Sequence, residues 1–269
     1  MTELHTVTAF YTIKSKHSVS EYENWIERFF RTSQSTITCF YDSTESRDLL
    51  LRNGADRSSV ELVQLAIDHF WTSSLPIDWE RQHSLDRERT IHSIDLYKVW
   101  LEKTAFVCRV AQTSQARFLL WRDIGQVRSR AEEAATSRWN LELIRDRLER
   151  SARINVVQLQ KFDWDARSIT MAEAFVDLNH MNFAAGANLW GVREAWAPWR
   201  TALEETAVDA HDAGFFMAKD QILYSYLLAT RNDLVMGRPT PRIRKGQDKW
   251  FSLGRVLSQR REPGELPNN

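Results

Sequence analysis

The sequence predicts an α/β protein in which helices flank a mostly parallel central sheet. Strand-like and helix-like segments alternate through the first 65 residues, and a later strand, Phe118–Trp121, is apolar at every position. Such alternation is typical of parallel sheets covered by helices, and strands buried on both faces read as unbroken apolar runs. The 269 residues show no internal repeat and no Gly-, Ser- or Pro-rich linker. We therefore predict one domain over residues 1–259 and a disordered tail at 260–269.

In chain order, the first strands are rich in β-branched and aromatic residues. They are predicted near 6–11, 36–40 and 60–65. Ser18 and Glu21 form a capping box ahead of aromatic residues at helical spacing, which predicts the first helix. A short helix at Arg47–Arg52 is predicted to end at Asn53-Gly54.

The second part of the chain begins with an irregular segment at 72–86, which contains Pro76. A long helix follows, with an apolar stripe from Ile94 to Ala111 that leaves Lys98, Glu102 and Arg109 outside it. The remaining predictions are strands at 117–122 and 154–159, a charged helix at 130–150, a small-residue turn at 183–191, and helices at 192–209 and 216–229.

Composition limits the partners. Lys and Arg together number 36, as do Asp and Glu, so no overall charge draws the protein to nucleic acid or to an anionic membrane. No apolar run reaches the ~18 residues of a membrane span. The first residues lack the features of a signal peptide, which favours a cytoplasmic location. Cys39 and Cys108 lie in apolar surroundings and are expected to be buried free thiols.

The motifs of dinucleotide, P-loop, esterase and zinc-hydrolase sites are absent from the sequence. Asp163-Trp164-Asp165 places two carboxylates at a metal-binding spacing, but such pairs are common in solvated turns. Asp123 is a stronger candidate, because it follows the apolar strand and precedes Gly125. Ligands of open α/β sheets bind beyond the carboxyl ends of strands. The alternative is that Asp123 caps the segment after the strand.

Motifs spread over residues 6–257 resemble one known family. They are Thr8-Ala9-Phe10, Tyr22 to Trp25, His92, Leu96-Tyr97, Trp100, Lys103, Asp123-Ile124-Gly125-Gln126-Val127-Arg128, Ala185-Gly186 through Gly191 with Trp196, Gly214 through Asp220-Gln221, and Trp250-Phe251. In order and spacing they resemble the HtrL/YibB family, whose members are regarded as glycosyltransferases. Two departures are Ala185-Gly186-Ala187 in place of a Gly-Gly turn, and Arg122 where many glycosyltransferases of nucleotide-binding α/β fold carry a first aspartate.

The resemblance implies a GT-A-like fold that moves a sugar from a nucleotide-diphosphate donor to an acceptor hydroxyl on a glycan, a lipid or a small molecule. The implied donor-binding residues are Thr8, Ala9, Phe10, Lys103, Arg128 and Gly186; Asp123 would hold a divalent cation (Mn²⁺ or Mg²⁺), and Asp220 with Gln221 would be catalytic. Because Arg122 leaves a single carboxylate, a cation at Asp123 needs further oxygens from the diphosphate and water.

Simpler structural interpretations stand beside these roles. Lys103 can extend its side chain from the helix edge, and Asp220 can be a helix-start carboxylate favoured by the helix dipole. The competing class of function is a non-catalytic nucleotide- or sugar-binding protein on the same fold, an alternative that Arg122 favours.

Overall fold

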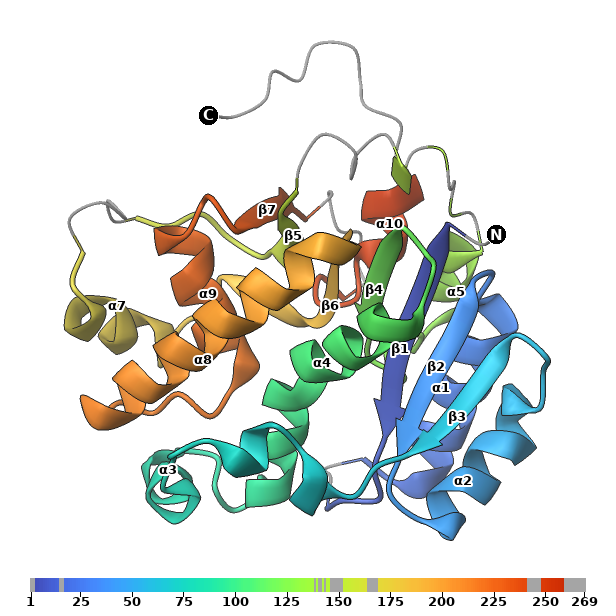
Figure 1. Cartoon of the computed structure of the whole chain (residues 1–269), viewed down its shortest axis with the longest axis horizontal. Helices are drawn as coiled ribbons and strands as arrows, with labels where there is room; N and C mark the ends of the chain where they lie inside the picture. The colour runs from blue at the N-terminus through green and yellow to red at the C-terminus, as the bar shows by residue number, and fades with distance from the viewer. Residues whose placement is uncertain are drawn as a thin grey trace.

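Seven strands form one mixed sheet in the order β3-β2-β1-β4-β6-β5-β7 (Figure 1). The strands are β1 (Leu4–Phe10), β2 (Thr36–Tyr41), β3 (Val60–Gln64), β4 (Phe118–Arg122), β5 (Ile154–Gln158), β6 (Ala184–Val192) and β7 (Val235–Pro239). All neighbouring pairs are parallel except those of β6, which runs antiparallel to both β4 and β5. The predicted α/β class, single domain and mostly parallel sheet are confirmed.

The computed structural model describes residues 3–14, 17–137, 139, 142, 144–145, 152–163, 169–240 and 248–258. The predicted tail at 260–269, Trp164 and Asp165 of the Asp-x-Asp motif, and most of 137–150 lie outside these residues.

Helices cover both faces of the sheet (Figure 1). One face carries α4 (Ile94–Thr113), α7 (Met171–Leu178), α8 (Trp196–Asp212) and α9 (Asp220–Thr230), and the other carries α1 (Val19–Thr32), α2 (Thr44–Leu50), α5 (Arg130–Thr136) and α10 (Leu253–Ser258). The short elements are the π-helix η1 (Leu51–Ala55), the 3₁₀ turns η2 (Ile67–His69), η3 (Thr72–Ser74) and η4 (Arg193–Ala195), and the helix α3 (Trp79–Leu85).

The central strand β4 is buried at all five positions, as its apolar run predicts. Leu119 and Trp121 face the core formed with α4, α8 and α9, whereas Phe118 and Leu120 face the core formed with α10. Successive side chains of a strand point to opposite faces, so a strand between two helical layers has no position for an exposed polar residue. Arg122, the one charged residue of β4, therefore also lies inside the protein.

Two sheet segments differ from the prediction. Residues 183–191, predicted as a turn, form most of β6, which is the strand between β4 and β5. Its small residues are required by packing: a β-carbon on Gly191 would lie 2.9 Å from Cδ1 of Ile154. Strand β7 was not predicted, because Gly237 and Pro239 read as loop residues.

Among the helices, the short segment predicted at Arg47–Arg52 begins earlier, as α2, and passes into η1. The helix predicted at 192–209 is α8, and the one predicted at 216–229 begins only at Asp220. Glu102, predicted to lie outside the apolar stripe of α4, is fully buried and accepts hydrogen bonds from the backbone N–H groups of Trp71 and Thr72. Cys39 and Cys108 are buried free thiols, as expected.

Candidate functional site

The candidate site lies where the chain order of the sheet reverses, between β1 and β4. From β1 the chain moves outward to β2 and β3, then returns to place β4 on the other side of β1. In open α/β sheets the crevice at such a point, beyond the carboxyl ends of the strands, is the usual ligand site. Val7 pairs with Trp121 in parallel register, so Asp123 lies at the same end of the sheet as Phe10.

Lys103 of α4 lies beneath this edge and is only 4% exposed. Its ammonium Nζ donates to Oδ2 of Asp220 at 2.7 Å and to the carbonyl oxygen of Gly186 at 3.0 Å, and lies 3.0 Å from Oδ1 of Asp123. An ammonium group has three donors, and here each has an acceptor. The side chain is thus buried among three oxygens rather than extended from the helix edge.

Asp220 begins α9 and its side chain is completely buried against β6. A β-carbon on Gly186 would lie 2.6 Å from Asp220 Oδ1 and closer still to Oδ2, a contact that real β-carbons do not make. Oδ1 also accepts the backbone N–H of Gln221 at 2.8 Å. The sequence Ala185-Gly186-Ala187 thus provides the space that the carboxylate fills.

Electrostatics support a charged Lys103. Burial lowers its pKa, but the neighbouring carboxylates of Asp123 and Asp220 outweigh burial and raise the pKa above the ordinary value. Burial raises the pKa of Asp220, and the charge of Lys103 only partly offsets this rise. Removing one partner of a buried ion pair leaves an uncompensated charge, so the two groups depend on each other.

Asp123 is the member of this group that solvent reaches, with 33% of its side chain exposed. The indole N–H of Trp121 donates to Oδ1 at 2.8 Å, and Lys103 contacts the same carboxylate. Trp121 itself is buried, so the carboxylate is held from below by two fixed groups. The arrangement presents one oriented carboxylate to a ligand at the edge of the sheet.

The first-strand candidates are only partly placed at this surface. Thr8 is fully buried, and its hydroxyl has no hydrogen-bond partner among the described residues. Ala9 and Phe10 are half-buried at the carboxyl end of β1, next to Asp123. Their positions fit the edge of a ligand site, whereas the Thr8 side chain belongs to the interior.

The Arg128 side chain packs between aromatic rings, whereas Gln221 joins the group through its backbone N–H, which donates to Oδ1 of Asp220. The Arg128 guanidinium lies between the rings of Trp25 and Phe251, at 4.3 Å and 4.4 Å from the ring centres, and its Nε donates to Gly125. No ion pair joins Arg128 to Asp123 among the described residues. Gln221 is half-buried and follows Asp220 in the first turn of α9.

Arg122 faces the opposite side of the sheet from Asp123. Its guanidinium stacks on Phe29 at 4.6 Å and Trp139 at 4.5 Å, and donates to Ser33 Oγ at 3.0 Å. With the amide of Gln126 oriented oxygen-inward, Gln126 accepts from Arg122 Nη2 at 2.6 Å. Burial lowers the Arg122 pKa to about 9. The residue in place of a first aspartate therefore adds no charge to the edge where Asp123 lies.

Asp42 is a further carboxylate at this end of the sheet, and no sequence motif pointed to it. It follows β2 as Asp123 follows β4, and its Oδ2 accepts the backbone N–H of Thr12 at 3.2 Å. Asp42 and Asp123 flank β1, so two strand spacings, about 10 Å, separate their backbones. Oδ1 of Asp42 also contacts the hydroxyl of Ser46, so protein groups already hold this carboxylate. The signal that would have found Asp42 is its position directly after a strand.

A second polar cluster contains Asp86, Glu88 and His92, whose ligand atoms lie within 4.8 Å of one another and can hold a metal ion. These groups already have protein partners. Asp86 accepts from His92 Nδ1 and from the hydroxyl of Tyr97, both at 2.7 Å, and Lys219 Nζ pairs with Glu88 at 2.5 Å. Lys219 and Asp220 are adjacent, so the start of α9 is tied to two separate polar groups.

Comparisons with known proteins do not extend the resemblance. No protein-family model matches the chain, and no curated protein matches it either. None of the helices in the described part of the chain is long and apolar enough to cross a membrane.

Proposed function

We propose that this protein is a glycosyltransferase of GT-A-like fold that uses a nucleotide-diphosphate sugar. The observation that carries the proposal is the partly exposed Asp123 carboxylate at the reversal point between β1 and β4, oriented by Lys103 and Trp121. Crevices at this point of α/β sheets bind nucleotides. The motif order that resembles the HtrL/YibB family supports the same assignment.

In this proposal Asp123 binds the donor, through ribose hydroxyls or as one ligand of a divalent cation. Mg²⁺ prefers six oxygens, and Asp123 supplies one or two of them. The diphosphate and water would supply the rest. Ala9 and Phe10 would border the nucleotide at the carboxyl end of β1.

The roles of Lys103 and Asp220 change from those that the resemblance implies. All three donors of Lys103 already have acceptors, so its function in the proposal is to orient Asp123 and neutralise charge beneath the donor. Asp220 is completely buried, so it holds Lys103 in place. A general base must reach the proton that it removes, and Asp220 in this position reaches only protein groups.

The reaction would break the bond between the sugar C1 and the diphosphate oxygen and form a bond from C1 to the acceptor oxygen. The nucleoside diphosphate leaves with the electron pair, and the proton of the acceptor hydroxyl passes to the departing diphosphate or to water. The protein would accelerate this reaction mainly by holding the donor and the acceptor in a reactive orientation. The acceptor class remains a glycan, a lipid or a small molecule.

A non-catalytic nucleotide- or sugar-binding protein is the second candidate. The complete burial of Asp220 favours it, because the carboxylate expected to act on the acceptor is enclosed by protein. Both candidates bind the donor at Asp123, and only the transferase releases free nucleotide from it.

The test is release of nucleoside diphosphate from a panel of nucleotide sugars, with and without Mn²⁺, by the wild-type protein and by Asp123→Asn. The exposed Asp212 near the end of α8 offers a matched control, Asp212→Asn. The transferase proposal expects release by the wild-type protein and the control and little by Asp123→Asn. Donor binding without release would support the second candidate. The absence of both donor binding and nucleotide release would contradict both candidates.

A further inference from the structure

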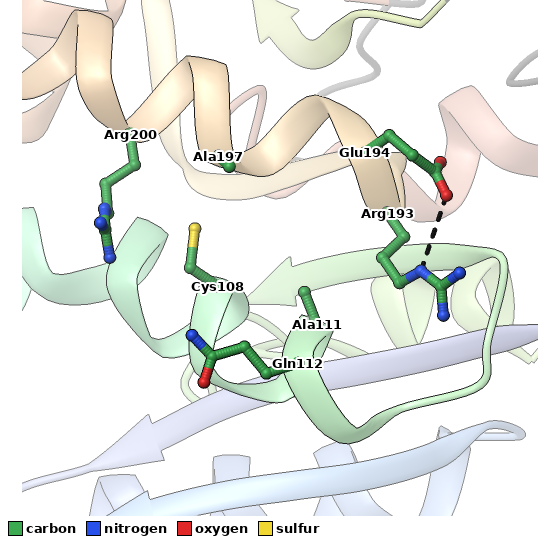
Figure 2. Close-up of a pocket in the computed structure, with 7 residues that line it drawn as sticks. All are labelled: Cys108, Ala111, Gln112, Arg193, Glu194, Ala197 and Arg200. Atoms are coloured by element: carbon green, nitrogen blue, oxygen red, sulfur yellow. Dashed lines mark ion pairs between the residues drawn. The ribbon is translucent and has the colours of Figure 1, made fainter.

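A cavity of about 380 Å³ lies between α4 and the start of α8, away from the carboxyl end of β4 (Figure 2). Its lining residues are Cys108, Ala111, Gln112, Arg193, Glu194, Ala197 and Arg200. Arg193 also donates to the carbonyl oxygen of Ser114, in the loop that leads into β4. The cavity therefore belongs to the amino end of β4, whereas Asp123 lies at its carboxyl end. Small-molecule sites begin at about 300 Å³, so the volume suits a compact ligand.

Positive charge exceeds negative charge in the lining. Arg193 and Arg200 contribute two guanidinium groups, against the single carboxylate of Glu194. That carboxylate is 70% exposed and lies 3.6 Å from Nε of Arg193, so solvent weakens the pair. Figure 2 shows Arg200 descending from α8 beside α4, whereas the guanidinium of Arg193 turns towards Glu194 and away from Gln112. The first turn of α8 also lacks a side-chain cap, which adds positive helix-dipole potential.

Arg200 supplies the observation that points to a ligand. Its Nε is buried and has no hydrogen-bond partner among the described residues. Buried polar atoms are nearly always paired, and a guanidinium offers donors only, so the missing partner is an acceptor. Ala111 and Ala197 form an apolar part of the cavity wall next to the arginine, and Gln112 adds a neutral amide that can form hydrogen bonds. The thiol of Cys108 is not reactive here, because burial raises its pKa to about 11.

We propose that this cavity binds a small organic anion, bearing a carboxylate or phosphate group, through Arg200, with Arg193 adding positive charge at the other end of the lining. Charge-assisted hydrogen bonds to guanidinium groups are shorter and stronger than neutral ones, and the planar fork matches both kinds of oxyanion. The site is separate from Asp123, so it does not depend on the proposed transferase activity.

The experiment is an NMR titration of the full-length protein with malonate and, separately, inorganic phosphate at constant ionic strength, following backbone amides. We expect saturable shifts at Cys108, Ala111 and Ala197, with the tighter probe identifying the preferred oxyanion. Arg200→Gln should weaken binding about tenfold or more, the effect of one lost charge-assisted hydrogen bond. Arg109→Gln, a change at an exposed arginine of α4 outside the lining, should leave the affinity unchanged.

A second variant tests the proposal independently in case Arg200→Gln does not fold. Ala197 is exposed at the cavity, so Ala197→Phe fills the space without removing a charge, and it should also abolish the shifts. Equal weakening by Arg200→Gln and Arg109→Gln, or shifts that persist in Ala197→Phe, would identify an adventitious ion only. Absence of saturable binding by both probes would overturn the proposal as well.

Discussion

The carboxylate of Asp220 fills the space that a side chain at Gly186 would need, with Oδ1 only 2.6 Å from the position of a β-carbon. The same carboxylate accepts from Lys103, which in turn donates to the carbonyl oxygen of Gly186. Strand β6, helix α4 and helix α9 therefore meet at one buried charge pair beneath Asp123. The first two predictions test this junction by stability.

Gly186→Ala should destabilise the protein by about 2–4 kcal/mol, because the new methyl group displaces the buried carboxylate of Asp220 from Lys103. Urea denaturation measures the free energy of unfolding. Gly125→Ala is the control, since its β-carbon would lie 3.2 Å from the ring of Trp25 rather than against a charge. A loss in Gly186→Ala no larger than that in the control would show that Asp220 moves aside at little cost.

Lys103→Met should cost about 3–5 kcal/mol, because it leaves the buried carboxylate of Asp220 without its ion-pair partner. Asp220→Leu should cost less, because Lys103 keeps the carboxylate of Asp123. The double variant should cost clearly less than the sum, and the double-mutant cycle gives the coupling energy. Additive losses would mean that the two groups do not form a stabilising pair. Thermal and urea unfolding of the four proteins supply the values.

The acidic cluster predicts a pH dependence of stability. Burial raises the pKa of Asp86, but hydrogen bonds from the Glu88 backbone, His92 and Tyr97, together with the charge of Lys219, outweigh it and lower the pKa. Because its pKa is lowered in the folded protein, the ionised Asp86 stabilises the fold at pH values above the ordinary aspartate pKa of about 4. This stabilisation is lost as the pH falls through the folded-state value. The stability difference between wild type and Asp86→Asn should therefore shrink below about pH 4, and a constant difference would contradict this.

Arg122→Lys should destabilise the protein by about 1–3 kcal/mol while leaving donor binding unchanged. Lysine lacks the planar fork that contacts Gln126 and stacks between Phe29 and Trp139. The side chain also faces away from Asp123. Unfolding and donor-binding measurements on the same variant check both parts, and a large loss of donor affinity would place Arg122 at the ligand site after all.

The alternation of strands and helices was readable from the sequence because burial on two faces demands long apolar runs, as in Phe118–Trp121. Strand β6 was not, because Gly186 and Gly191 resemble turn residues when their packing partners are unknown. Those partners, Asp220 and Ile154, lie far away in the sequence. Position after a strand correctly placed Asp123 at the edge shared with β1. The burial of Lys103 could not be predicted either, because its counter-ion Asp220, in α9, lies 117 residues later in the sequence.

We expect Asp123 to bind the nucleotide-sugar donor and Asp220 to support it from below. Calorimetric titration of the best nucleotide-sugar donor into wild type, Asp123→Asn and Asp220→Asn measures both effects. We expect Asp123→Asn to lose about tenfold or more in affinity, and Asp220→Asn to lose affinity together with stability. Unchanged donor affinity in Asp123→Asn would contradict the account. Intact binding with lost nucleotide release in Asp220→Asn would instead make Asp220 the catalytic base.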